Sequence, residues 1–285
     1  MAAARTLRHL LDAIKFEHTV FALPFAYVAM VLAAGGWPGW HVAIWVTLAM
    51  VGARTLAMSV NRFADRWIDA ANPRTRGRHL PAGLLRPSQV ALAAVLSAGL
   101  LALAAWMLNP LCLMLAPLAV LFLVGYSYTK RFTWLSHWIL GFTDGIAAAG
   151  GWIAVRGSFD PPVFILWFAL TVWIAGFDLI YACQDVDFDR AAGLHSVPAR
   201  FGIRRALQVA RACHVLTVAA FALLGVALGL GVLYWLGVVV VSALLVYEHS
   251  LVAPDDLSRL DVAFFNVNGY IAVVLLGAVL GGLWV

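Results

Sequence analysis

Long, continuous apolar runs constrain this chain more than any other feature of its sequence. The chain has 285 residues, of which 64% are hydrophobic, and its mean hydropathy is +0.91. A helix needs about 20 apolar residues to cross the roughly 30 Å hydrocarbon layer of a bilayer. Several runs reach that length. Because they are continuous and do not alternate with polar residues, they favour membrane-spanning helices over a β-barrel.

We predict an all-α integral membrane protein with nine spans, divided by turn-forming stretches such as "GGWPGW" at 35–40. A seven-span arrangement, in which neighbouring spans merge, is the alternative. The predicted spans are residues 18–36, 41–61, 88–108, 110–128, 135–155, 162–184, 206–228, 231–249 and 262–284.

The chain is predicted to be one domain, residues 1–285. "GRHLPAG" at 77–83 and "GLHSVPARFG" at 193–202 resemble each other at similar positions, four spans apart. They indicate either a repeated four-helix unit, 1–130 and 131–250 followed by a last helix at 262–284, or a chance similarity.

The basic residues divide unequally between the two sides of the membrane. Of the 19 Lys and Arg residues, only Arg156 falls on one side. Since Lys and Arg are enriched in cytoplasmic loops, we expect a plasma (inner) membrane protein with a cytoplasmic N-terminus and an external C-terminus. Topology thus explains the net charge of +5, which gives no reason to expect a nucleic-acid partner. No obligate protein partner is evident.

The polar residues gather in three segments at cytoplasmic helix ends, and we therefore expect the active site at the cytoplasmic mouth. In the first segment, Asn61, Asp65 and Asp69 recur every four residues. At about 100° per residue, this spacing places the three side chains on one stripe of a helix.

The segment at 177–202 is predicted to carry a second acid stripe. On a continuous helix, Asp178, Asp185 and Asp189 fall on one face and Asp187 on the opposite face. Carboxylates gathered at a membrane surface need compensating cations. Oxygen ligands without His or Cys suit Mg²⁺, and nearby basic residues suit phosphate. The alternative is a solvated helix end of mixed charge.

Three motifs in this order resemble the UbiA superfamily of intramembrane prenyltransferases. They are "NRFADRWIDAANPRTRGRHLPAG" (61–83), "YSYTKRFTW" (126–134) and "DVDFDRAAGLHSVPARFG" (185–202). The motifs come at separations similar to those of the family, the resemblance extends over nearly the whole chain, and it implies nine transmembrane helices. Arg62 departs from the family pattern, because many members carry an Asp directly after the motif Asn.

The resemblance implies a role for each matching residue. Two Mg²⁺ ions would bridge a polyprenyl diphosphate, one held by Asn61, Asp65 and Asp69, the other by Asp185 and Asp189. The expected diphosphate-binding residues are Asn61, Arg74, Arg78, Tyr126, Lys130 and Arg131. The expected catalytic residues are Asp65, Asp69, Lys130, Asp178, Asp185 and Asp189.

Two of these roles have alternatives. Tyr126 either shields the allylic cation or contacts phosphate, or it is a tyrosine of the interfacial belt. Asp178 either removes a proton or orients the acceptor, or it is a structural partner of Arg54.

The implied reaction is Mg²⁺-dependent transfer of a polyprenyl group to an aromatic acceptor such as 4-hydroxybenzoate, in ubiquinone or menaquinone synthesis. The stretch "IKFEHTVFALPF" (14–25) together with Arg62 resembles the UbiA-like branch associated with the futalosine route, so 1,4-dihydroxy-6-naphthoate is an alternative acceptor. Haem and chlorophyllide are others. A cation-coupled transporter is less favoured, because transporters tend to bind near the membrane midplane, whereas these acids lie at one mouth.

Overall fold

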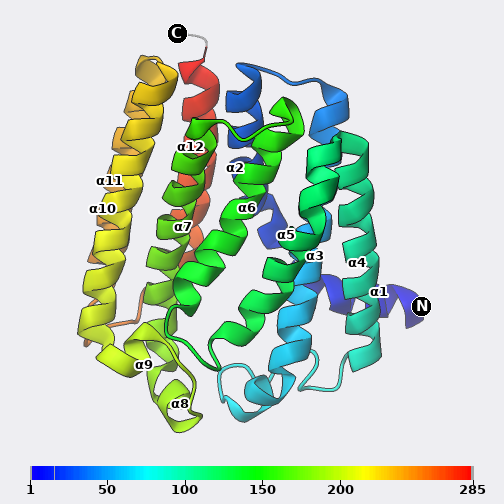
Figure 1. Cartoon of the computed structure of the whole chain (residues 1–285). Coiled ribbons are helices and arrows are strands. Elements are labelled where there is room, and N and C mark those ends of the chain that lie inside the picture. Colours follow the sequence, from blue (N-terminus) through cyan, green and yellow to red (C-terminus); the bar gives the residue numbers. More distant parts are fainter. Residues whose placement is uncertain (1, 16, 284–285) are drawn as a thin grey trace.

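The computed structural model describes residues 2–15 and 17–283, and within them every regular element is helical. The long helices lie roughly along one axis and form a single bundle (Figure 1). They are α2 (Glu17–Ala34), α3 (Trp40–Ala71), α4 (Pro87–Leu108), α5 (Pro110–Thr129), α6 (Ser136–Arg156), α7 (Pro161–Ala182), α10 (Ile203–Leu228), α11 (Val232–Ser250) and α12 (Asn268–Gly282).

Eight helical stretches of the described chain are long and apolar enough to cross a membrane. The chain is therefore a multi-pass membrane protein. The remaining long helix, α2, contributes a shorter apolar stretch, Leu23–Ala34. The prediction of an all-helical membrane bundle is confirmed, and the count of nine spans stays a prediction.

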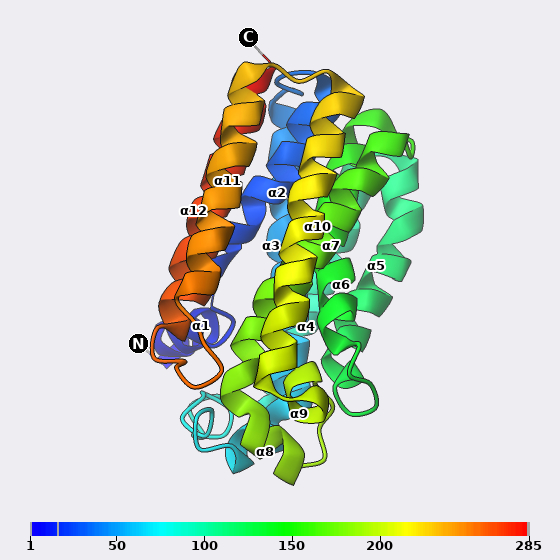
Figure 2. The same cartoon turned by 90° about the vertical axis from the view of Figure 1, so that its left-hand side faces the viewer.

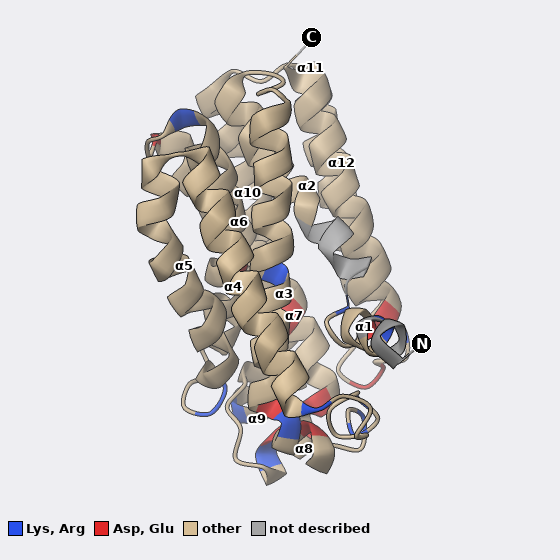
Figure 3. Cartoon of the chain, turned by 90° about the vertical axis from the view of Figure 1, so that its right-hand side faces the viewer, with Lys and Arg blue, Asp and Glu red and all other residues tan. Residues whose placement is uncertain are grey.

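Short elements connect the long helices at one end. They are α1 (Ala2–Ala13), the 3-10 turn η1 (Cys183–Asp185), α8 (Val186–Ala191), α9 (Val197–Phe201) and the π-helical turn η2 (Val262–Val267). Most of the charged residues also lie at this end of the bundle, whereas α12 ends at the opposite one (Figure 3).

The helices pack in neighbouring pairs around one extended apolar core. α3 packs on α4, α7 lies between α6 and α10, and α2 lies between α6 and α12. α11 pairs with α12 along its length (Figure 2).

Glycines set two of the close approaches of α6. A Cβ at Gly141 would collide with the α7 backbone, and one at Gly151 with the α2 backbone. Gly150 has open space in front of it and lines the central cavity described below. Small residues commonly permit such close helix approaches in membranes, whereas Gly150 leaves room in the cavity.

Candidate active site

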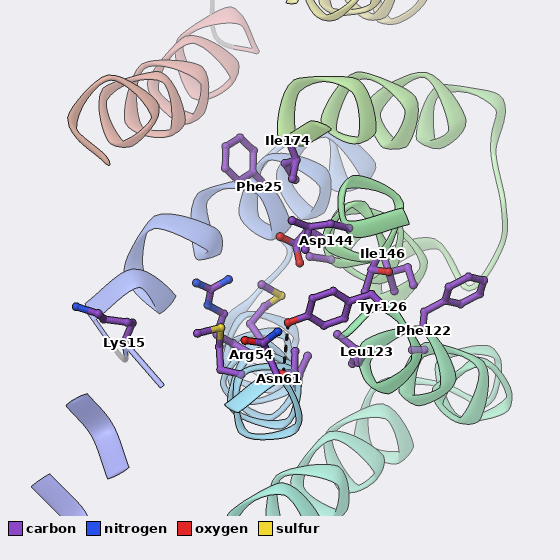
Figure 4. Close-up of a pocket in the computed structure, with 18 of the residues that line it drawn as sticks. Lys15, Phe25, Arg54, Asn61, Phe122, Leu123, Tyr126, Asp144, Ile146 and Ile174 are labelled. Atoms are coloured by element: carbon purple, nitrogen blue, oxygen red, sulfur yellow. Dashed lines mark hydrogen bonds between the residues drawn. The ribbon is translucent and has the colours of Figure 1, made fainter. Parts of the chain in front are cut away.

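A cavity of about 1080 Å³ runs through the bundle between α3, α4, α5, α6 and α7. At the charged end of the bundle its wall carries polar side chains. Leu108 and Cys112 extend the wall to the α4–α5 turn at the opposite end. Figure 4 shows part of this wall. The polar lining residues that the site uses are Lys15, Arg54, Asn61, Asp69, Arg74, Arg78, Tyr126, Asp144, Asp178 and Tyr181.

The first acid stripe forms as predicted, because α3 is one unbroken helix of 32 residues that continues past the apolar span. Asn61 donates from Nδ2 to Oδ2 of Asp65 at 3.2 Å, one turn away. Asp65 is only 1% exposed and Asp69 only 4%. Carboxylates this buried need charged or hydrogen-bonding partners.

Basic residues of the other segments supply these partners. Lys130 Nζ lies 2.6 Å from Oδ2 of Asp65, and Arg131 Nη2 lies 2.9 Å from its Oδ1. Arg78 Nη1 contacts Oδ1 of Asp69 at 2.7 Å. Among the described residues, the buried Oδ2 of Asp69 has no hydrogen-bond partner. This oxygen remains available to a further cation.

The second acid stripe does not form as a single face. α7 ends at Ala182, the 3-10 turn η1 follows, and only then does α8 begin. The turn interrupts the regular progression of about 100° per residue on which the prediction depended. Asp187 is exposed, as expected, but the other three aspartates have separate surroundings.

Each of those three aspartates has its own partner. Asp185 is held by Arg74, whose Nη2 lies 2.5 Å from Oδ2 and whose Nε lies 2.9 Å from Oδ1. Asp189 accepts a hydrogen bond from Ser196 at 3.0 Å. Asp178 contacts His137 at 2.7 Å. The predicted partnership of Asp178 with Arg54 is therefore not the one observed.

The Arg74 contact also joins the two aspartate segments. Asn72 donates to Asp185 Oδ1 at 3.1 Å beside Arg74, and Arg74 reaches the Tyr181 hydroxyl at 3.1 Å. Burial lowers the pKa of Arg74, but the hydrogen bond and charge of Asp185, together with Tyr181, raise it overall above its usual value. Arg74 therefore stays cationic.

The third segment is tied to the second by the main chain. The N–H of His195 donates to the carbonyl of Lys130 at 2.7 Å. The three charged segments predicted to act together thus meet at one end of the cavity. Within residues 2–15 and 17–283, however, no three His, Cys, Asp or Glu side chains are already gathered as a metal site. The metal-ligand assignments therefore stay predictions.

Tyr126 belongs to the cavity wall. Its hydroxyl donates to the Ala57 carbonyl of α3 at 3.4 Å, and its ring borders the cavity (Figure 4). This position does not fit the alternative of an interfacial-belt tyrosine.

Three residues of the site were given no functional role by the sequence analysis. Arg54 and Asp144 line the cavity from α3 and α6 (Figure 4), and the Arg54 Nε is buried without a hydrogen-bond partner among the described residues. An ionisable residue inside an apolar span is a signal of function, and it could have identified Asp144. No sequence signal distinguishes the buried His137.

Arg62 connects the site to the N-terminal helix. Its Nε donates to the Ala13 carbonyl at the end of α1 at 3.0 Å. Asp12, Ala13 and Lys15 line the cavity mouth next to His79. The pKa of His79 is lowered by burial and by nearby His9, although Asp12 opposes the shift.

Comparison with known proteins gives consistent results. A model described as the UbiA prenyltransferase family matches residues 22–270. A 4-hydroxybenzoate octaprenyltransferase of Vibrio campbellii is 31% identical over 260 residues, covering 90% of this chain and 89% of that protein. A protein of the same name from Vibrio cholerae is 29% identical over 256 residues, with the same two coverages.

Solved structures of UbiA homologues superpose on this chain. An apo UbiA homologue from Aeropyrum pernix superposes with a TM-score of 0.86 at 32% identity, covering 93% of this chain and 98% of that one. A UbiA homologue from Archaeoglobus fulgidus bound to GPP and Mg²⁺ superposes with a TM-score of 0.72 at 17% identity, covering 97% and 100%. The second likeness supports the fold alone.

Proposed function

This chain belongs to the UbiA prenyltransferase family and is a prenyltransferase, and we propose that it transfers a polyprenyl group from a polyprenyl diphosphate to an aromatic acid such as 4-hydroxybenzoate. The observation that carries the proposal is the pairing of four basic residues with aspartates at the charged end of a largely apolar cavity. The basic residues are Arg74, Arg78, Lys130 and Arg131.

The aspartates fit a hard divalent cation. The donor set is oxygen only, which Mg²⁺ prefers, and one buried oxygen of Asp69 has no partner among the described residues. We assign Asn61, Asp65 and Asp69 to one ion and Asp185 and Asp189 to a second. The ions, when bound, neutralise charge on the diphosphate as it departs.

The basic residues have to change partners when substrate binds. Lys130 and Arg131 both contact Asp65, and Arg78 contacts Asp69. A diphosphate at this end offers them phosphate oxygens in place of carboxylates, and charge-assisted hydrogen bonds of this kind are strong. Stabilising the negative charge that develops on the leaving diphosphate is then their catalytic task.

The rest of the cavity suits an allylic cation and its tail. Apolar side chains such as Leu101, Leu115 and Phe122 line it away from the charged end. They exclude water, which would otherwise capture the cation. Tyr126 lies at the polar end and presents a π-face, which attracts cations.

Arg54 points to an acidic acceptor. It is a cation in the cavity wall, with its Nε unpartnered within the described chain. A carboxylate on the acceptor would supply the missing partner. Both 4-hydroxybenzoate and 1,4-dihydroxy-6-naphthoate carry this group. The Vibrio relatives are named for the first compound, and we therefore place it ahead of the second.

The test uses membranes that contain the protein, geranyl diphosphate, Mg²⁺ and either acid, with the prenylated acid measured by mass. Product should disappear with EDTA and in Asp65→Ala, and it should persist in Asp187→Ala, whose side chain is exposed. If neither acid is prenylated while diphosphate is still bound, the acceptor assignment fails. If diphosphate does not bind, the assignment of the charged end fails.

A further inference from the structure

His137 and Asp178 form a hydrogen-bonded pair at the cavity wall, apart from the four basic residues. Asp178 comes from α7, is part of the cavity wall and keeps a side-chain exposure of 24%. His137 comes from the first turn of α6 and is 3% exposed. Its Nδ1 lies 2.7 Å from Oδ2 of Asp178.

The second ring nitrogen of His137 fixes the direction of this hydrogen bond. The backbone N–H of Val197 points at Nε2 over 3.3 Å. A backbone N–H can only donate, so Nε2 carries the lone pair and the proton of the neutral imidazole sits on Nδ1. Nδ1–H therefore donates to Asp178, and Oδ1 of Asp178 has no donor among the described residues.

Asp178 differs from the aspartates at the charged end in the charge of its partner. Asp65, Asp69 and Asp185 each contact a Lys or an Arg. Asp178 contacts a neutral imidazole, so no direct cation offsets its negative charge. A carboxylate in this state, open to the cavity through one oxygen, is suited to accept a proton.

We propose that His137 is a positioning residue that holds Asp178 as the base for aromatic prenylation. The inference rests on the proposed function. When C1 of the allylic cation bonds to a ring carbon, that carbon still carries its hydrogen. The C–H bond then breaks, its electron pair restores the aromatic ring, and the proton passes to Oδ1 of Asp178. The proton is released to water after the product leaves.

The contact with Val197 also links the base to the charged segment at 185–202, which carries Asp185 and Asp189. Val197 begins α9, and the preceding Ser196 donates to Asp189. A shift of this segment therefore moves the N–H that donates to Nε2 of His137, and with it the orientation of the ring and of Asp178. Assembly of the diphosphate end and placement of the base are coupled through one backbone N–H.

Two substitutions of His137 separate positioning from folding. In His137→Asn, the amide nitrogen occupies roughly the place of Nδ1 and can still donate to Asp178. In His137→Gln, the amide extends toward the place of Nε2, so the contact with Val197 is kept and the one with Asp178 is lost. His41→Gln is the control, because His41 contacts the Met107 carbonyl near the opposite end of the bundle.

The readout is the rate of prenylation with normal and ring-deuterated acceptor. We expect His137→Gln to lower kcat by about 10–100-fold, to leave the KM for prenyl diphosphate unchanged, and to show a primary deuterium isotope effect that the wild type lacks. His137→Asn should recover most of the rate. Asp178→Asn, which leaves His137 intact, should also show the isotope effect.

The results that overturn the inference are equally specific. If the Gln and Asn variants of His137 lose rate equally, or Asp178→Asn prenylates at the wild-type rate without an isotope effect, His137 does not position a base. If the wild-type protein prenylates no aromatic acid, the proposed function itself fails, which is a different result. Should His137→Gln not fold, the Asp178→Asn measurement still decides.

Discussion

We propose that Asp65 links metal binding to diphosphate binding. Its carboxylate is 1% exposed and contacts both Lys130 and Arg131. A buried charge that loses its partner is strongly destabilised. If the diphosphate draws Lys130 away, Asp65 needs a new cation, so each ligand should strengthen binding of the other.

Lys130→Met tests this linkage. We expect kcat/KM for prenyl diphosphate to fall by about 100–1000-fold, as for loss of one preorganised group that stabilises a leaving oxyanion. Arg76→Met is the matched control, because Arg76 is an exposed base on the neighbouring loop. Equal effects of the two substitutions would mean that Lys130 acts only through the general positive potential of this end.

We propose that Arg54 binds the carboxylate of the aromatic acceptor. Arg54→Met should raise the KM for the aromatic acid by about 10–100-fold, since a charge-assisted hydrogen bond contributes about 1.5–3 kcal/mol. The KM for prenyl diphosphate should stay constant. Steady-state kinetics with each substrate varied separately measures both values, and a rise in the diphosphate KM alone would move Arg54 out of the acceptor site.

The common face of the aspartates was predicted correctly where the helix continues, in α3, and wrongly where the helix is interrupted, after α7. α3 runs unbroken through Asn61, Asp65 and Asp69, so the periodicity of the sequence gives their common face. The segment after α7 contains no Gly or Pro between Cys183 and Asp189 to indicate a break. The 3-10 turn there accompanies tertiary contacts of Asp185 with Arg74 and Asn72, which local sequence does not contain.

The tertiary partners of buried side chains could not be predicted from the sequence either. Arg62 was an unexplained departure in the sequence, and its contact with Ala13 explains it only once α1 is placed. His137 likewise acquires meaning through Asp178 and Val197, which lie 41 and 60 residues away in the chain.

The contact between Arg62 and the Ala13 carbonyl predicts that Arg62 stabilises α1. A cation near the C-terminus of a helix stabilises its free carbonyl groups, and the Nε of Arg62 meets one of them. In Arg62→Leu, amide hydrogen exchange in α1 should become faster while exchange in α3 stays slow. Arg66→Leu is the control, since Arg66 contacts the Phe63 carbonyl within its own helix. Unchanged exchange in α1 would show that its apolar contacts with Leu85 and Val90 suffice.

For the whole molecule, the unequal charge distribution predicts orientation. Almost all basic residues lie at one end of the bundle (Figure 3), and this end should face the cytoplasm. In a variant without native cysteines, a membrane-impermeant maleimide should label Ser158→Cys in intact cells and Arg76→Cys only in inverted vesicles. Labelling of both sites from the same side would contradict the topology.

We propose that the aspartates and bases at this end of the cavity hold the diphosphate for transfer. The most direct test is an experimental structure with Mg²⁺ and a non-ionising polyprenyl thiodiphosphate. We predict phosphate oxygens in contact with Arg74, Arg78, Lys130 and Arg131, with metal at Asp65 and Asp69 and the tail in the apolar cavity. A diphosphate bound elsewhere, with the Lys130–Asp65 and Arg74–Asp185 pairs intact, would contradict the claim.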